Sequence, residues 1–492
     1  MPFTPSARFN ASSFSIFKRS MMQDDQLPLV DAIDGECFAA ALEEHDVDFG
    51  ADGDDVVYTP AITLWALVSQ VFFSEEMRSC KAAVARVASL WAALGRRVCD
   101  TNTGAYCRAR AKIPFEAIRT ITLRLAENAE SQMEVDTRVS EQEFEDSMAP
   151  SVIGEVKSNP AGGRLLLVDG FTITAADTPE NQAEYPQNPA QAEGLGSPIL
   201  RCLTLVSMFT GMLVDLACGP YSGKETGETA LLRQLLNELR PGDILVADCY
   251  LCTYWIVASC QARGAKIVMK NHHKRDDHPA DARRLCKGQR LVIWQRPDCP
   301  DWMSKEEHQQ QPETIEIRLV DVQVPQKGFR PDVFTVATTM VDHKIRTGSW
   351  IASVYRSRWM VELDIRAIKC SLGMDILRAR SPAMVRTELW SCLLAYNLMR
   401  LKMLQSCAAQ GRDPRSVSFA TTMQLLATNW LLCAVIGVTV ELAELGQISS
   451  CSERVGHRAG RIEPRKNKRR RKLIALMIKP RSEYQAEMKA AA

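Results

Sequence analysis

The sequence lacks three features that would point to a function class directly: a strong net charge, a secretory leader and paired metal-finger ligands. Its 60 Lys and Arg residues nearly balance 59 Asp and Glu residues, so overall basicity does not indicate a nucleic-acid partner. The first 20 residues contain no apolar stretch typical of a secretory signal. Cys249 and Cys252 form a CxxC, but no second Cys or His pair follows at zinc-finger spacing. We therefore expect a cytosolic protein whose 16 cysteines are mostly small buried hydrophobes.

A long run without charged residues, from Ser416 to Val440, could in principle cross a bilayer. The run contains Gln424, Asn429 and several threonines, which are costly in a lipid environment. We therefore expect a buried helix here and no membrane span.

The charges are distributed unevenly along the chain. Residues 24–55 are rich in Asp and Glu, whereas residues 454–481 are strongly basic, with seven basic residues in the eight from Arg465 to Lys472. Such asymmetry is typical of a tail that contacts nucleic-acid phosphates without reading sequence. A disordered solubilising tail is the alternative.

The periodicity of apolar residues changes along the chain and predicts its organisation. The predicted N-terminal part has a flexible acidic segment over 1–58, a helical DNA-binding domain over 59–130 and a linker over 131–162. A mixed α/β domain is predicted over 163–405, with a β-rich insertion over about 271–345. Helices over 406–450 and a basic tail over 451–492 follow.

The helical segment contains a basic cluster beside a turn. Asn102 begins a short helix that carries Arg108 and Arg110, Lys112 follows, and Pro114 opens the next helix. Two short helices with basic residues at one end could enter a DNA groove. A plain helical bundle with a basic surface fits the same pattern.

Two apolar runs, LLLVDG and ILVADC, lead into an aspartate, Asp169 and Asp248. Ends of strands in an α/β sheet are where catalytic groups gather, because side chains there leave the core. Two carboxylates side by side repel unless cations neutralise them. Two divalent ions about 3.5–4 Å apart could do so and support phosphoryl transfer. Each aspartate alone is equally compatible with an ordinary turn.

The stretch VYRSRWMVELDIRAIKCSLG, residues 354–373, reads as one helix with a polar strip. With Tyr355 at zero, Arg358 falls at roughly 300°, Glu362 at roughly 340° and Lys369 at roughly 320°. A carboxylate between two cations and a phenol suits a metal ligand that faces phosphates. A solvated face with i,i+3 and i,i+4 ion pairs is the alternative.

The motifs VDGFTITAADTPEN, VADCY and YRSRWMVELDIRAIK together resemble those of the DDE transposases of the insertion-sequence-four (IS-four) family. The last motif contains Y-x2-R-x3-E-x6-K in full, and the resemblance spans roughly residues 60–480. It implies a ribonuclease H-like mixed-sheet catalytic core with a β-rich insertion, preceded by helices and followed by helices and a basic tail. It also implies that Asp169, Asp248 and Glu362 are the catalytic metal ligands. The ions would be Mg²⁺, with Mn²⁺ able to substitute, and Tyr355, Arg358 and Lys369 would hold phosphates.

The resemblance further implies binding to double-stranded DNA of transposon ends and target, metal-dependent strand cleavage and strand transfer, and a homodimer in the synaptic complex. The expected location is the cytoplasm, at the nucleoid. Asp177, in the stretch Asp177–Asn181, remains a rival for the first ligand. Two other functions stay open: a domesticated DNA-binding protein without chemistry, and a carboxylate-dependent sugar hydrolase, which the basic strip disfavours.

Two further features of the insertion have ordinary explanations. His272 and His273 could ligate a metal, but a basic loop facing DNA is preferred because the carboxylates need no histidine. Trp294 and Trp302 could stack on a base, but packing on the sheet is preferred.

Overall fold

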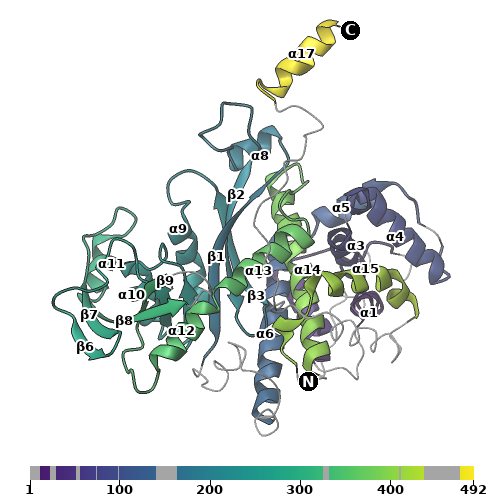
Figure 1. Ribbon diagram of the computed structural model, residues 1–492. Coiled ribbons are helices and arrows are strands. Elements are labelled where there is room, and N and C mark those ends of the chain that lie inside the picture. The colour runs from purple at the N-terminus through teal and green to yellow at the C-terminus, as the bar shows by residue number, and fades with distance from the viewer. Residues whose placement is uncertain are drawn as a thin grey trace, which may run out of the picture.

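The computed structural model describes residues 11–22, 29–50, 56–73, 75–97, 99–139, 163–324, 332–408, 412–436 and 477–491. Helices form one half of the molecule and a long sheet with covering helices forms the other (Figure 1). Among the described residues, no helix is long and apolar enough to cross a membrane. The expected basic run at 465–472 lies outside these residues.

Over the described ranges, the sheet has nine strands in the order β3-β2-β1-β4-β5-β9-β8-β7-β6. The strands are β1 (Leu165–Thr174), β2 (Ile199–Ser207), β3 (Leu213–Pro220), β4 (Ile244–Ala247), β5 (Lys266–Lys270), β6 (Arg283–Cys286), β7 (Gln289–Gln295), β8 (Thr314–Val324) and β9 (Asp332–Thr338). Strands β1 to β3 form an antiparallel meander, and β4 and β5 add in parallel to β1. This order and these directions are those of a ribonuclease H-like core, so the predicted fold class is confirmed.

The β-rich insertion does not form a separate body, because its strands continue the same sheet. β9 pairs antiparallel with β5, and β8, β7 and β6 follow. Of the two tryptophans of this region, Trp294 is buried, as preferred, whereas Trp302 is 37% exposed and packs on helix side chains: it lies under the guanidinium of Arg233, with Cζ 3.9 Å from the ring centroid, and edge-on to Trp255.

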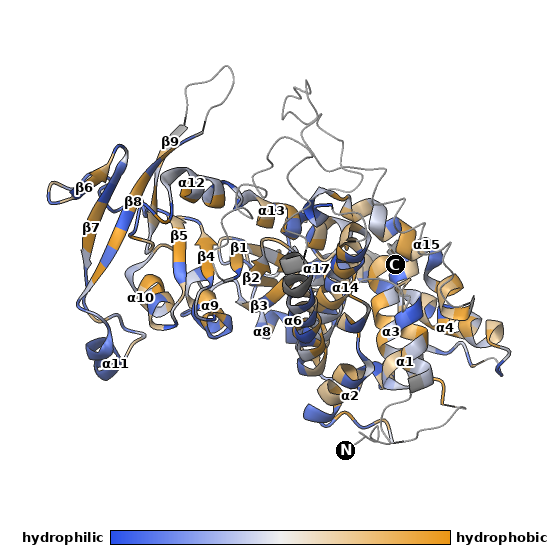
Figure 2. Cartoon of the chain, turned by 90° about the horizontal axis from the view of Figure 1, so that it is seen from below, coloured by the Kyte–Doolittle hydropathy of each residue, from blue (hydrophilic) through white to orange (hydrophobic). Residues whose placement is uncertain are grey.

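Helices cover both faces of the sheet, as Figure 2 shows for α12 and α13 on one side of β4 and β5 and α9 and α10 on the other. Their bounds are α9 (Glu228–Leu235), α10 (Tyr254–Ala262), α12 (Gly348–Arg356) and α13 (Trp359–Arg366). Alternate residues of each strand enter different cores. Leu167 and Val246 pack with α12 and α13, whereas Leu166 and Leu245 pack with α9 and α10.

The helical half combines both ends of the chain. Its helices are α1 (Ala11–Ser20), α2 (Gly35–Glu44), α3 (Pro60–Phe72), α4 (Cys80–Ala93), α5 (Thr103–Ala111), α6 (Phe115–Val139), α14 (Pro382–Ala408) and α15 (Phe419–Ile436). The charge-free run is thus mainly helix α15, in which Trp430 is buried beside Trp65 of α3, with ring centroids 5.6 Å apart.

Two of the sequence expectations for this half differ from the structure. The acidic segment at 1–58 was expected to be flexible, but α1 and α2 belong to the core through Phe14, Phe17 and Phe38. Their apolar residues recur at helical spacing. The linker expected from residue 131 begins later, because α6 continues to Val139.

Candidate active site

The two aspartates lie at the same level on neighbouring strands. β1 and β4 are parallel, with Leu165 opposite Ile244 and Leu167 opposite Val246. Asp169 and Asp248 each follow by two residues, so their side chains start from the same level and the same face as Leu167 and Val246. That face is the one covered by α12 and α13.

The expectation that both strands end at the aspartate is right for β4 and wrong for β1. β4 ends at Ala247, whereas β1 continues to Thr174 because β2 pairs with it over that whole length. Asp169 therefore lies inside a strand, at the point where β4 leaves it. Its backbone carbonyl accepts a hydrogen bond from Thr204 Oγ1 of β2 at 3.2 Å, which fixes the strand there.

Asp169 is partly buried among charged groups. Its Oδ1 accepts the Gly170 N–H at 2.8 Å, and its Oδ2 lies 3.3 Å from Arg358 Nη1. Burial raises the pKa of Asp169, the Gly170 N–H and Arg358 lower it, and the carboxylates of Asp248 and Glu362 raise it. The three predicted carboxylates therefore share one electrostatic environment.

Asp248 caps the turn that follows β4. Its Oδ1 accepts the backbone N–H groups of Tyr250, at 3.0 Å, and Leu251, at 3.2 Å. Within the described residues, no hydrogen bond reaches Oδ2. The turn thus fixes the side chain while one carboxylate oxygen stays available.

The predicted single helix at 354–373 is interrupted twice. α12 ends at Arg356, α13 begins at Trp359, and residues Ala367–Ser371 form a π-helical turn. The break at Ser357 has a local cause, because the Ser357 hydroxyl donates to the Val354 carbonyl at 2.6 Å. The shared arc of four polar residues that an ideal helix predicts is therefore not kept.

The interruption still places Arg358 and Glu362 beside Asp169. Arg358 Nη2 donates to Glu362 Oε1 at 2.7 Å, and Arg358 Nη1 faces Asp169. Glu362 is the most open of the three, with its side chain 56% exposed. Arg358 thus links the helix carboxylate to the strand carboxylate.

Tyr355 lies on the side of the turn that follows β4. Its ring packs against Phe334, with centroids 5.2 Å apart. Burial raises the pKa of Tyr355 to about 12; Arg358 lowers it, and Asp248 and Cys249 raise it. The phenol therefore stays protonated near Asp248 and can donate a hydrogen bond there.

Lys369 is displaced from the other three. It lies in the π-helical turn, and its charge lowers the pKa of Cys202 on β2, which burial holds well above the ordinary value. An extra residue per turn rotates the helix surface at this point. Lys369 therefore faces the region of β2 and not the Arg358 pair.

The basic cluster of the helical half lies on α5, which packs against α3 and α4. Arg108 and Lys112 are exposed, and Lys112 Nζ is 3.4 Å from the Phe49 carbonyl. Arg110 is partly committed to the protein itself, since its Nη1 contacts Cys80 Sγ at 3.1 Å. A short helix and a turn are present as predicted, but the second helix, α6, is 25 residues long and not short. Contact of this cluster with DNA stays a prediction.

Asp177, the rival for the first ligand, has a different environment. It is exposed, and its Oδ1 accepts from Gln182 Nε2 at 2.9 Å in the loop and helix after β1. His272 and His273 stack on each other with centroids 4.3 Å apart, and Tyr250 lies edge-on to His273. In the described part of the chain, no three His, Cys, Asp or Glu side chains are arranged as a ready metal site.

Residues 160–398 match the family model described as the transposase DDE domain. The chain is also 25% identical over 277 residues to transposase InsG of insertion sequence element IS4 from Escherichia coli K12, covering 54% of this chain and 59% of InsG. By these two matches, the chain is similar to the IS4-related DDE transposases. The matched segment contains Asp169, Asp248 and Glu362, and it leaves out the basic cluster on α5.

The chain spans somewhat more than half the length of InsG in this match. A solved structure is also similar: a piggyBac transposase synaptic complex with hairpin DNA, with 10% identity, a TM-score of 0.39, and 90% of this chain and 86% of that chain covered. The fold assignment rests on the strand order described above.

Sequence reasoning missed one carboxylate that lies close to this site. Glu228 begins α9 on the opposite face of the sheet and lies against Gly170, the residue after Asp169. A glutamate that opens a helix is so common that nothing in the sequence selects it. Only the strand register and the start of α9 bring it to Asp169.

Proposed function

We propose that the protein binds the terminal inverted repeats of an insertion sequence and performs metal-dependent DNA strand cleavage and strand transfer. The observation that carries this proposal is the alignment of Asp169 with Asp248 on neighbouring strands, with Arg358 linking Asp169 to Glu362. All of these residues lie within the segment that matches the transposase DDE domain.

The donor set fits a divalent cation, because its ligands are carboxylate oxygens of the kind that Mg²⁺ prefers. Asp169, Asp248 and Glu362 would hold two Mg²⁺ ions, and Mn²⁺ could substitute. Bound divalent cations supply activation of a water or 3′-hydroxyl and stabilisation of the leaving oxygen. Before cations bind, Arg358 provides the positive charge between Asp169 and Glu362.

In this proposal, polar side chains of α12, α13 and the π-helical turn bind phosphates of the DNA. Arg358 exchanges its carboxylate partners for a phosphate of the cleaved strand, where a guanidinium binds bidentately. The Tyr355 hydroxyl donates to a neighbouring phosphate, and Lys369 binds a phosphate farther along, toward β2. Two copies of the chain hold the paired transposon ends and target DNA in a synaptic complex at the nucleoid.

The test is a cleavage assay combined with a gel shift on one duplex. Inverted repeats in the DNA that flanks the gene provide the transposon-end sequence. Asp169→Asn, Asp248→Asn and Glu362→Gln should reduce cleavage in Mg²⁺ to background while the DNA complex still forms, because each change removes metal-binding charge and little volume. Asp177→Asn is the matched control and should cleave normally.

Two outcomes would contradict the proposal. Cleavage at the wild-type rate by any of the three carboxylate variants removes that residue from the site. Binding of the duplex by the wild type, without cleavage in either Mg²⁺ or Mn²⁺, identifies a DNA-binding protein that keeps the fold without the chemistry.

A further inference from the structure

Glu228 lies against β1 at Gly170, where the absence of a side chain leaves room for the glutamate carboxylate. A Cβ atom built on Gly170 would lie 2.4 Å from Glu228 Oε1 and 2.7 Å from its Cδ, both too close for real atoms. The Glu228 carboxylate therefore rests against the backbone of the residue that follows Asp169. At this level β4 has already ended, so β1 has lost its neighbour on that side.

The charges around Glu228 are those of the active site. Burial raises the pKa of Glu228, the carboxylates of Asp248 and then Asp169 raise it further, and Arg201 lowers it. Asp169 and Glu362 reach the end of β4 from the face covered by α13, and Glu228 reaches it from the face covered by α9. The charge of Glu228 is thus coupled to both aspartates, from the face of the sheet opposite them.

The ordinary roles of a helix-opening glutamate do not account for this position. Glu228 follows the N-cap Gly227, so its charge gains from the helix dipole. Within the described residues, its carboxylate makes no hydrogen bond and no ion pair. Arg201, the nearest cation, instead donates to the Thr226 carbonyl at 3.1 Å and lies over Tyr221.

We propose that Glu228 is a fourth carboxylate of the metal site, which holds a divalent cation together with Asp169 and Asp248, either directly or through a cation-bound water. This inference rests on the proposed function, since it concerns the same cations. It makes Gly170 part of the site as well, because any side chain at that position would occupy the space of the Glu228 carboxylate.

The experiment measures Mn²⁺ binding to the full chain without DNA, by the loss of the free Mn²⁺ signal in electron paramagnetic resonance. Glu228→Gln should weaken Mn²⁺ binding by about 10–100-fold, the usual effect of losing a supporting carboxylate at a metal site. Glu225→Gln is the matched control. Glu225 lies three residues earlier, is 55% exposed and pairs with Arg233, so its loss should leave Mn²⁺ affinity unchanged.

The same titration separates this inference from the proposed function. If Asp169→Asn and Asp248→Asn weaken Mn²⁺ binding but Glu228→Gln binds like the wild type, Glu228 has only a structural role and this inference is wrong. If neither aspartate variant changes Mn²⁺ binding, the proposed metal site itself is wrong.

A second variant moves Glu228 without removing its charge. Gly170→Ala should push the flexible Glu228 side chain away, so its Mn²⁺ affinity should fall about as far as that of Glu228→Gln. The double variant should bind no more weakly than either single one, because both act on the same contact. Additive losses would show that Gly170→Ala acts through Asp169, and would overturn the role assigned to this contact.

Discussion

At the scale of single residues, Arg358 is the side chain that contacts two of the site's carboxylates. It faces Asp169 and Glu362 together, and each partner is at least one-quarter exposed. Such partly exposed pairs contribute only roughly 0–1 kcal/mol to stability. Their larger effect is on the ionisation of Asp169, whose pKa burial raises and Arg358 lowers.

This balance predicts a pH dependence for Arg358→Ala. The variant loses a group that lowers the pKa of Asp169, so that pKa should rise further. Asp169 must be ionised to hold a cation. With a higher pKa, the carboxylate becomes protonated at a higher pH than in the wild type. The acid limb of the cleavage rate against pH should therefore move to higher pH, apart from any overall loss of rate.

Arg356→Ala provides the control for this profile. Arg356 is exposed two residues earlier, and its Nη2 donates to Ser353 Oγ at 2.9 Å. Its removal changes the net charge equally but should leave the acid limb in place. An acid limb at the same pH in both variants would show that Arg358 does not control the ionisation of Asp169.

At the scale of elements, helix α13 is held by a buried charged cluster on the face opposite the active site. Asp364, fully buried, accepts hydrogen bonds from Arg415 at 2.7 Å, from Arg400 and from the Tyr396 hydroxyl at 3.0 Å. Arg415 also donates to the carbonyl of Ser207 at the end of β2. The cluster thus ties the helix that carries Glu362 to α14 and the sheet.

Asp364→Asn should therefore be strongly destabilising. It would leave two buried guanidinium groups facing a neutral amide, and breaking a buried pair in this way costs about 3–5 kcal/mol. The free energy of unfolding from urea titrations measures this loss. Asp375→Asn, at an exposed position shortly after the π-helical turn, should stay within about 0.5 kcal/mol of wild type. Equal stability of the two variants would contradict the anchoring role.

The elements also show where sequence reasoning succeeds and where it stops. Strand-like runs and their order were predictable, because β2 and β3 read as apolar strands joined at Thr210-Gly211, and Gly211 adopts the left-handed conformation there. The breaks around α13 were not predictable, since a serine can bond the carbonyl one turn back without ending a helix, and no residue type within 367–371 marks a π-helical turn. Lys369 was displaced for that reason.

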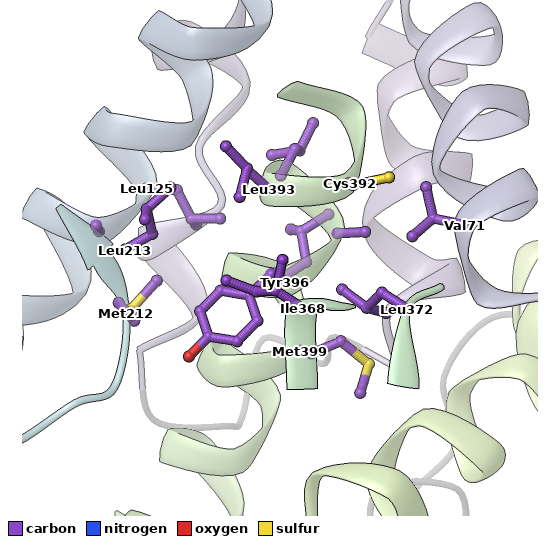
Figure 3. Close-up of a cluster of buried hydrophobic side chains, with 14 of the residues drawn as sticks. Val71, Leu125, Met212, Leu213, Ile368, Leu372, Cys392, Leu393, Tyr396 and Met399 are labelled. Carbon is purple, nitrogen blue, oxygen red and sulfur yellow. The ribbon is translucent and has the colours of Figure 1, made fainter. Parts of the chain in front are cut away.

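At the scale of the whole molecule, one core joins parts of the chain that the sequence separates. Figure 3 shows Leu393, Tyr396 and Met399 of α14 between Val71 of α3, Leu125 of α6 and the segment with Ile368 and Leu372. The apolar faces of the N-terminal helices are thus buried against those of the C-terminal helices, and the reverse. Sequence periodicity identifies each apolar face but not its partner, so this sharing could not be predicted.

The basic run of residues 465–472 lies outside the described residues, and its role stays a prediction from sequence. It precedes α17 (Arg481–Ala491), which extends away from the body of the molecule in Figure 1. If the run contacts phosphates, each contact adds about 0.9 to the slope of log affinity against log salt. Replacing its seven basic residues by Gln should therefore weaken DNA binding and lower that slope by up to about 6.

Fluorescence anisotropy with a labelled transposon-end duplex, over a series of KCl concentrations, measures this slope. The variant keeps the length of the chain, so a change cannot come from losing α17. Cleavage at saturating protein should remain near the wild-type rate, because phosphate contacts made by a tail add affinity without positioning the scissile bond. An unchanged slope would show that the run is a solvated tail and that the proposed DNA contacts come from the folded part of the chain alone.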